Sequence, residues 1–123
     1  MKKPALAFLK KMLDSPSPSG YEGPIQKVIR EFANEFADDV STDWHGNVVA
    51  AVNPEGSPRI MLAGHCDHIG LMVKHIDKDG YLRFTPIGGW ASRMRIGQRF
   101  ATWQATGPGS GVIARNAIPM PTA

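Results

Sequence analysis

Apolar residues recur at helical spacing in the first third of the chain. Between residues 4 and 13 the apolar positions lie three and four residues apart, which is the period of a helix. After a break rich in Ser, Pro and Gly over 14–20, a second stripe has the same period, and Pro24 suits its first helical turn. The members of this stripe are Ile25, Val28, Ile29, Phe32 and Phe36. The pattern predicts two amphipathic helices whose apolar faces pack into a core.

The pattern then changes to that of strands joined by tight turns. Residues 40–44 and 47–52 predict two strands that form a hairpin around His45, Gly46 and Asn47. Asp43 and Asn47 are expected to hold this turn through side-chain to backbone hydrogen bonds.

More strands are expected in the second half of the chain. A short apolar run over 60–64 predicts a buried strand. Strands over 69–76 and 81–85 flank a turn with the sequence Asp-Lys-Asp-Gly, which predicts a second hairpin. Further strands are expected over about 98–106 and 111–114.

The two halves of the chain differ in style. Residues 1–68 carry helices, a hairpin and a buried strand, as at the start of an α/β sheet domain. Residues 69–114 carry short strands with Gly turns, which is typical of a small β-barrel domain. The tail over 115–123 is expected to be loose. The sequence predicts an α/β fold in which the first part of a helix-covered mixed sheet runs into a β-rich domain.

Composition and charge favour a folded domain from a reducing compartment. The 123 residues are 42% apolar and 20% charged, which suits a folded protein. The net charge is +3, but the basic residues are scattered and form no stripe with aromatic residues, which argues against a nucleic-acid partner. The single Cys excludes an internal disulfide, and no stretch resembles a membrane span or a signal peptide. We therefore expect a cytoplasmic protein without a membrane partner.

The densest group of metal-binding and acid–base side chains, His65-Cys66-Asp67-His68, follows the predicted strand over 60–64. In an extended backbone His65 and Asp67 point to the same side. A metal-bound His is commonly oriented by a carboxylate, so the pair fits one ligand and its orienting partner. Zinc takes three or four ligands, and a hydrogen-bonded pair that ties a strand to a loop is the simpler explanation. His68 is a possible further local ligand, and Cys66 is expected to be a small buried apolar residue on the opposite face.

Short motifs occur in one order between residues 19 and 113, within a family-like stretch that covers about residues 5 to 113. They are Ser-Gly-Tyr-Glu-Gly (19–23), Asp-Trp-His-Gly-Asn (43–47), Ala-Gly-His-Cys-Asp-His-Ile-Gly-Leu-Met-Val (63–73), Ile-Asp-Lys-Asp-Gly-Tyr-Leu-Arg-Phe (76–84), Ile-Gly-Gly-Trp (87–90), Gly-Gln-Arg (97–99) and Gly-Val-Ile (111–113). In this order and spacing they resemble metallopeptidase family 42, which contains glutamyl aminopeptidases, tetrahedral (TET) aminopeptidases and proteins once labelled endoglucanase M.

The resemblance implies a cytosolic, homo-oligomeric hydrolase that removes N-terminal residues from peptides with two divalent metals, zinc or cobalt. It also implies a β-rich dimerisation domain inserted into the catalytic domain, in agreement with the change of style near residue 69. By position, His65 matches the first metal ligand of the family. Asp67 matches the catalytic carboxylate that orients this ligand. His68 departs from the family pattern, which usually has Glu at this place.

The other ligands of the family and its general base match no residue of this sequence. We therefore expect the chain to be truncated and inactive alone, and an interrupted reading frame would explain why the resemblance ends near Ala114. Two alternatives stay open. One is a non-catalytic oligomerising fragment with Trp90, Phe100 and Trp103 at a subunit contact. The other is a mononuclear metal-binding module that uses the His and Asp residues at 65–68.

Overall fold

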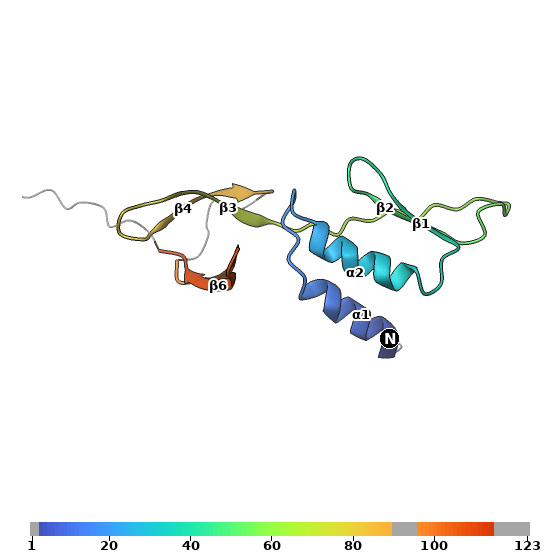
Figure 1. Cartoon of the computed structure of the whole chain (residues 1–123), viewed down its shortest axis with the longest axis horizontal. Helices are drawn as coiled ribbons and strands as arrows, with labels where there is room; N and C mark the ends of the chain where they lie inside the picture. Colours follow the sequence, from blue (N-terminus) through green and yellow to red (C-terminus); the bar gives the residue numbers. More distant parts are fainter. Residues whose placement is uncertain (1–2, 90–95, 115–123) are drawn as a thin grey trace, which may run out of the picture. The chain divides into compact units, whose positions relative to one another are not determined.

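The computed structural model describes residues 3–89 and 96–114, which fall into two units that divide after Gly89. The first unit contains the helices α1 (Lys3–Leu13) and α2 (Gly23–Ala33), followed by two β-hairpins (Figure 1). The second unit contains one hairpin. No helix in the described parts of the chain is long and apolar enough to cross a membrane.

Both predicted helices are present, but only α2 contributes buried residues. Ile25, Val28 and Ala33 of α2 are buried, whereas α1 has no buried residue. The aromatic ring of Phe8 in α1 stacks on that of Phe32 in α2, with 4.0 Å between the ring centroids. The predicted stripe also included Phe36, which lies beyond the end of α2 and meets Phe32 edge to face. The expected core is therefore centred on one face of α2.

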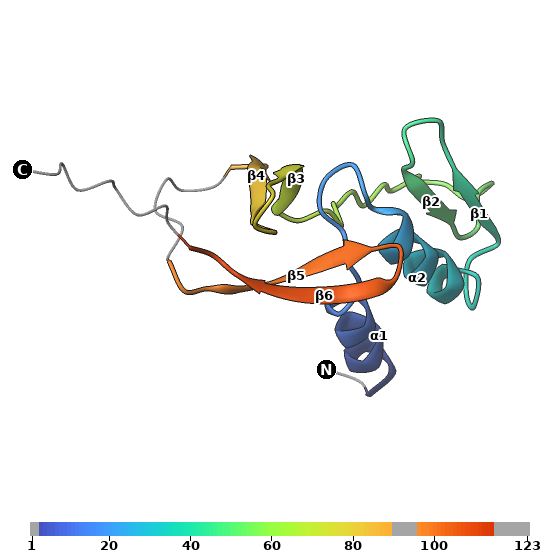
Figure 2. The ribbon, with the colours of Figure 1, turned by 60° about the vertical axis from the view of Figure 1, so that its left-hand side comes forward.

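The first predicted hairpin is confirmed as β1 (Asp39–Thr42) and β2 (Val48–Ala51), which pair antiparallel. The carboxylate of Asp43 accepts hydrogen bonds from the backbone N–H groups of His45 and Asn47, at 2.9 and 2.8 Å. The side-chain amide of Asn47 donates to the other oxygen of Asp43. As predicted, Asp43 and Asn47 hold the turn. β2 contacts α2, and both elements can be followed in Figure 2.

The predicted buried strand over 60–64 is wrong. This segment forms no strand, and Ile60, Met61 and Leu62 are 81%, 88% and 93% exposed. An apolar run becomes a buried strand only where other strands flank it, and no described residue pairs with this run. In place of the expected mixed sheet, the described residues form three separate two-stranded antiparallel sheets.

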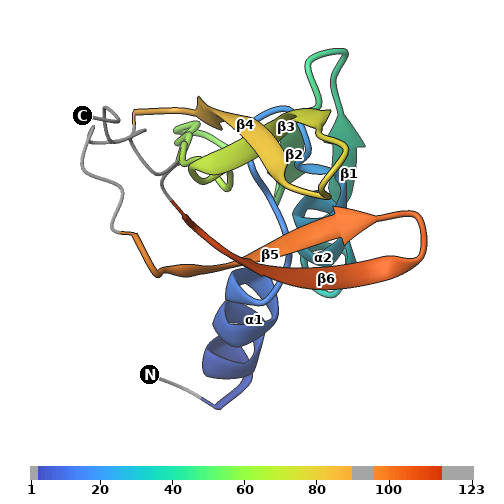
Figure 3. The ribbon, with the colours of Figure 1, turned by 90° about the vertical axis from the view of Figure 1, so that its left-hand side faces the viewer.

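The second hairpin agrees with the sequence pattern, whereas the third was expected only as two separate strands. β3 (Gly70–Ile76) pairs with β4 (Leu82–Ile87), with a bulge between Val73 and His75. β5 (Arg99–Gln104) pairs with β6 (Gly107–Val112), as Figure 3 shows. The last strand was expected to begin only at Gly111, but its pairing extends back to Gly107. The tail over 115–123 and Trp90 lie outside the described residues.

Candidate functional site

The loop between α1 and α2 runs beside the segment 66–68. Ser17 is fully buried, and its hydroxyl donates to the backbone carbonyl of Cys66 at 2.9 Å. The backbone N–H of His68 donates to the carbonyl of Ser17 at 2.9 Å, and the N–H of Ser19 donates to the carbonyl of His68 at 3.3 Å. These bonds form a short parallel bridge between Pro18 and His68. The bridge fixes the backbone on which the His and Asp side chains stand.

Gly70 permits this close approach. A Cβ atom added at Gly70 would lie 2.5 Å from the Cβ of Pro18, which is closer than real Cβ contacts. A residue with a side chain would therefore displace either the loop or the start of β3. Gly70, which lies within the His-containing motif over 63–73, thus has a packing reason to be there.

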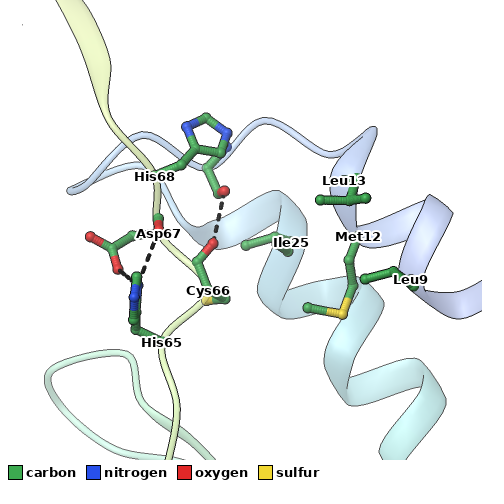
Figure 4. A pocket seen from close by; sticks show the side chains of 9 residues that line it. Leu9, Met12, Leu13, Ile25, His65, Cys66, Asp67 and His68 are labelled. Carbon is green, nitrogen blue, oxygen red and sulfur yellow. Dashed lines mark hydrogen bonds and ion pairs between the residues drawn. The ribbon is translucent and has the colours of Figure 1, made fainter.

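His65 and Asp67 form a hydrogen-bonded pair, as predicted. The Nδ1 of His65 lies 2.9 Å from the Oδ1 of Asp67, and the same nitrogen lies 3.2 Å from the backbone carbonyl oxygen of Asp67 (Figure 4). Because a carboxylate oxygen only accepts, Nδ1 carries the proton. The Nε2 of His65 then has a free lone pair, for which the described residues show no partner. The side chain of His65 is 84% exposed, so this lone pair is open to solvent.

Ser19 holds the other oxygen of the same carboxylate. Its hydroxyl donates to the Oδ2 of Asp67 at 2.6 Å. The hydrogen bond from Ser19, followed by that from His65, lowers the pKa of Asp67 below its ordinary value of 3.8. Both donors favour the ionised form, so Asp67 is a carboxylate over the whole neutral range.

Both ring nitrogens of His68 form hydrogen bonds with backbone groups. The backbone N–H of Ser17 donates to Nε2 at 3.2 Å, and Nδ1 donates to the carbonyl of Ile69 at 2.9 Å. The structure therefore gives His68 a bracing role between the loop and the strand. To bind a metal through Nε2, the ring would have to give up the bond from Ser17, so the ligand role of His68 stays a prediction. The described residues contain no group of three or more His, Cys, Asp or Glu side chains placed to hold a metal ion.

Cys66 faces the helices. Figure 4 shows its side chain toward Met12 and Ile25. A pocket of about 220 Å³ lies here, with Leu9 and Leu13 in its apolar wall, and His65, Asp67 and His68 also line it. Burial, followed by the charges of Asp67 and Glu22, raises the pKa of the Cys66 thiol. The thiol therefore stays protonated, and Cys66, which was expected to be buried, is only partly buried.

Ser17 and Ser19 are the site residues that the sequence pattern does not reveal. They lie in the run Ser-Pro-Ser-Pro-Ser-Gly, which predicts a break between helices, and although Ser19 opens the motif over 19–23, that motif does not show its partner. Their partners Cys66 and Asp67 lie 49 and 48 residues further along the chain. No local period links positions this far apart, so the contacts become visible only in the folded chain.

The residues present fit one corner of a metal site. An imidazole whose Nδ1 is held by a carboxylate and whose Nε2 is open is the usual arrangement of a metal-bound His. The family model for M42 glutamyl aminopeptidases matches residues 46–120, and the chain therefore belongs to this family. The resemblance drawn from the ordered motifs is confirmed.

Individual relatives agree with this assignment. The chain is 42% identical over 107 residues to the lysyl aminopeptidase of Pyrococcus furiosus, a match that covers 86% of this chain and 31% of the relative. It is 36% identical over 101 residues to the glutamyl aminopeptidase of Lactococcus lactis, which covers 80% and 28%. The chain thus spans less than a third of the length of these curated relatives.

A solved structure of similar fold is that of a TET aminopeptidase from a marine sediment Thaumarchaeota archaeon. Its TM-score is 0.86 at 33% identity, and the match covers 93% of this chain and 32% of that chain. The helices and small sheets of this chain therefore match part of the fold of a TET aminopeptidase, in agreement with the expected α/β class.

Proposed function

We propose that this chain supplies one metal-binding corner of a metal-dependent aminopeptidase. His65 is the ligand, through Nε2, and Asp67 is the carboxylate that orients it. The observation that carries the proposal is the 2.9 Å bond between the Nδ1 of His65 and the Oδ1 of Asp67, which leaves Nε2 open. Membership of the M42 family and the aminopeptidase names of the relatives support peptide N-termini as the substrate.

The contribution of these residues follows from their hydrogen bonds. Asp67 holds the proton on Nδ1, keeps the lone pair on Nε2, and its negative charge makes the imidazole a stronger donor to a metal. When two divalent metals, zinc or cobalt, are bound in the site, the chemistry they supply is polarisation of the peptide carbonyl and activation of a water. The side chain of His65 is 84% exposed, so a metal ion can reach it from solvent.

Catalysis needs more ligands than the described residues bring together. A catalytic zinc takes three protein ligands, and His65 is one. We therefore expect no hydrolysis by the 123-residue chain alone, and activity once the missing ligands are supplied. The family role of Asp67 as a catalytic-site carboxylate is part of the same proposal.

A chimaera tests the proposal. This chain replaces the matching part of the Pyrococcus furiosus lysyl aminopeptidase, and the product is assayed on lysine para-nitroanilide with zinc or cobalt. We expect the chimaera to be active and His65→Ala to lower its kcat/KM by about 100-fold or more, since even partners of ligands are worth 10–100-fold. His75→Ala is the matched control, because His75 is an exposed histidine of β3. A folded chimaera whose activity does not depend on His65 would contradict the proposal.

A homo-oligomer is proposed as well. The TET1 peptidase of Pyrococcus horikoshii assembles into a tetrahedron or a large octahedral shell, and a dodecamer is known for a TET1 protein. In this chain, Trp103 of β5 is half-exposed, and Phe100 lies on the same strand.

We propose that 69–114 is the start of a dimerisation domain that follows the catalytic part over 1–68. The cytoplasmic location expected from the sequence stays a prediction.

A further inference from the structure

The hydroxyl of Ser19 is a third member of the His65–Asp67 arrangement. The distance of 2.6 Å between the Oγ of Ser19 and the Oδ2 of Asp67 is typical of a charge-assisted hydrogen bond. Asp67 therefore receives one donor on each oxygen, Ser19 on Oδ2 and His65 on Oδ1. With both oxygens held, the carboxylate plane cannot turn without breaking a bond.

The order of these residues excludes a nucleophilic role for Ser19. In a Ser–His–Asp triad the hydroxyl donates to the imidazole, whereas here the carboxylate stands between Ser19 and His65. The hydroxyl proton of Ser19 points to an oxygen that is already ionised. Ser19 therefore acts on His65 only through Asp67.

The loop that carries Ser19 is held by contacts that do not involve the hydroxyl of Ser19. The backbone bonds between Ser17 and His68, the buried hydroxyl of Ser17 on Cys66, and the packing of Pro18 against Gly70 all hold the loop. The backbone N–H of Ser19 is bound to the carbonyl of His68 whatever its side chain is. Removing the exposed hydroxyl of Ser19 should therefore leave the loop in place.

We propose that Ser19 is a positioning residue. Through Asp67, its hydroxyl keeps the imidazole of His65 in the Nδ1-protonated form, in which Nε2 carries the lone pair for a ligand and the side chain is 84% exposed. The consequence for metal binding rests on the proposed function, but the control of the tautomer does not. Ser19 thereby links the loop between the two helices to the first ligand of the site.

The tautomer of His65 is measured by long-range ¹H–¹⁵N NMR on the 123-residue chain, at about pH 9, where free histidine is neutral. We expect the wild type to show a protonated Nδ1 and an unprotonated Nε2. Ser19→Ala is expected to lower the Nδ1–H to Nε2–H ratio by roughly threefold to tenfold, the effect of one modest hydrogen bond. Ser19→Thr, which keeps the hydroxyl, is expected to restore the ratio.

Ser15→Ala is the matched control. Ser15 lies in the same loop, but its hydroxyl bonds the carbonyl of Lys11 and does not touch Asp67. It is expected to leave the tautomer ratio of His65 unchanged. An unchanged ratio in Ser19→Ala would overturn the proposal. So would a Ser19→Thr variant that behaves like Ser19→Ala, because the hydroxyl would then not be the cause.

Metal affinity gives a second readout in the chimaera. Calorimetric titration with zinc is expected to show binding about 3- to 10-fold weaker in Ser19→Ala, less than the roughly 10- to 100-fold typical of a group that bonds the ligand directly, because Ser19 acts through Asp67. Wild-type affinity in this variant would overturn the metal-binding consequence. The two proposals can be told apart. If His65→Ala leaves the activity of the chimaera unchanged, the aminopeptidase role is contradicted, but the tautomer result on the 123-residue chain is unaffected.

Discussion

At the scale of single residues, the site depends on a glycine as much as on its polar side chains. Gly70 begins β3 and lies against Pro18, the loop residue that forms the parallel bridge with His68. The polar contacts of Ser17 and Ser19 exist only while this approach is possible. The role of Gly70 is therefore steric, and it can be tested without touching a polar atom.

Gly70→Ala is expected to lower the free energy of unfolding by about 1–3 kcal/mol, the usual cost of an overpacked position. The new Cβ would meet Pro18 and push the loop away from Asp67. Urea unfolding followed by circular dichroism measures the change. Gly64→Ala is the matched control, because a Cβ at Gly64 meets no atom within 4 Å. Equal stability of both variants would contradict the packing account.

Some of these contacts between single residues can be predicted from the sequence. The spacing of His65 and Asp67 correctly predicts that their side chains meet, because extended backbone sets every second side chain on one side. The contacts of Ser17 and Ser19 are missed, since they depend on how a loop folds back over 48 or more residues. The bonds that occupy both nitrogens of His68 are missed for the same reason.

At the scale of elements, each of the three hairpins joins neighbouring segments of the chain. The turns of the first two hairpins carry local signals, such as Asp43 with Asn47 and Asp77 with Gly80. Local signals are what sequence patterns contain, and the first two hairpins and both helices are therefore predicted. The segment 60–64 is mispredicted because burial of an apolar run depends on distant partners.

The β1–β2 turn should depend on pH through Asp43. Hydrogen bonds from Asn47, with a smaller contribution from His45, lower the pKa of Asp43 below 3.8. Because the folded pKa is lowered, the stabilisation is present above the unfolded pKa and is lost as the pH falls through the lowered value. Asn47→Ala is expected to raise the pKa of Asp43, measured by carboxyl ¹³C NMR. A pKa that does not move would contradict the role of Asn47.

The segment 60–64 should tolerate polar substitution, because its apolar side chains are exposed. Leu62→Ser is expected to change the free energy of unfolding by less than about 0.5 kcal/mol, as at other exposed positions. Ile25→Ser, in the buried face of α2, is expected to cost about 3 kcal/mol or more, because it removes a core side chain and buries a hydroxyl. Denaturant unfolding of the two variants compares them directly. A large loss of stability in Leu62→Ser would mean that the run is buried after all.

At the scale of the whole molecule, the family is evident from sequence while the activity is not. Motifs from Ser19 to Ile113 occur in one order, and such a series is specific even though each motif alone is weak. Activity needs several ligands at one point, and the described residues contain no group of three or more His, Cys, Asp or Glu side chains placed to hold a metal ion. The chain therefore identifies its family firmly, whereas its part in the catalytic site is a proposal that rests on the hydrogen-bonded pair of His65 and Asp67.

The 123-residue chain is expected to show no turnover of amino-acid para-nitroanilides, with or without added zinc or cobalt. One imidazole ligand cannot hold a metal against water, and catalytic zinc takes three protein ligands. A continuous colorimetric assay on purified protein measures this. Metal-dependent turnover that His65→Ala abolishes would contradict the claim that further ligands are needed.

The central claim is that His65 is a metal ligand, and metal content tests it most directly. The chimaera, its His65→Ala variant and its His75→Ala variant are dialysed against zinc, and the bound metal per chain is measured by inductively coupled plasma mass spectrometry. The account predicts that His65→Ala loses bound zinc while His75→Ala keeps the full amount. Equal zinc in all three proteins would contradict it.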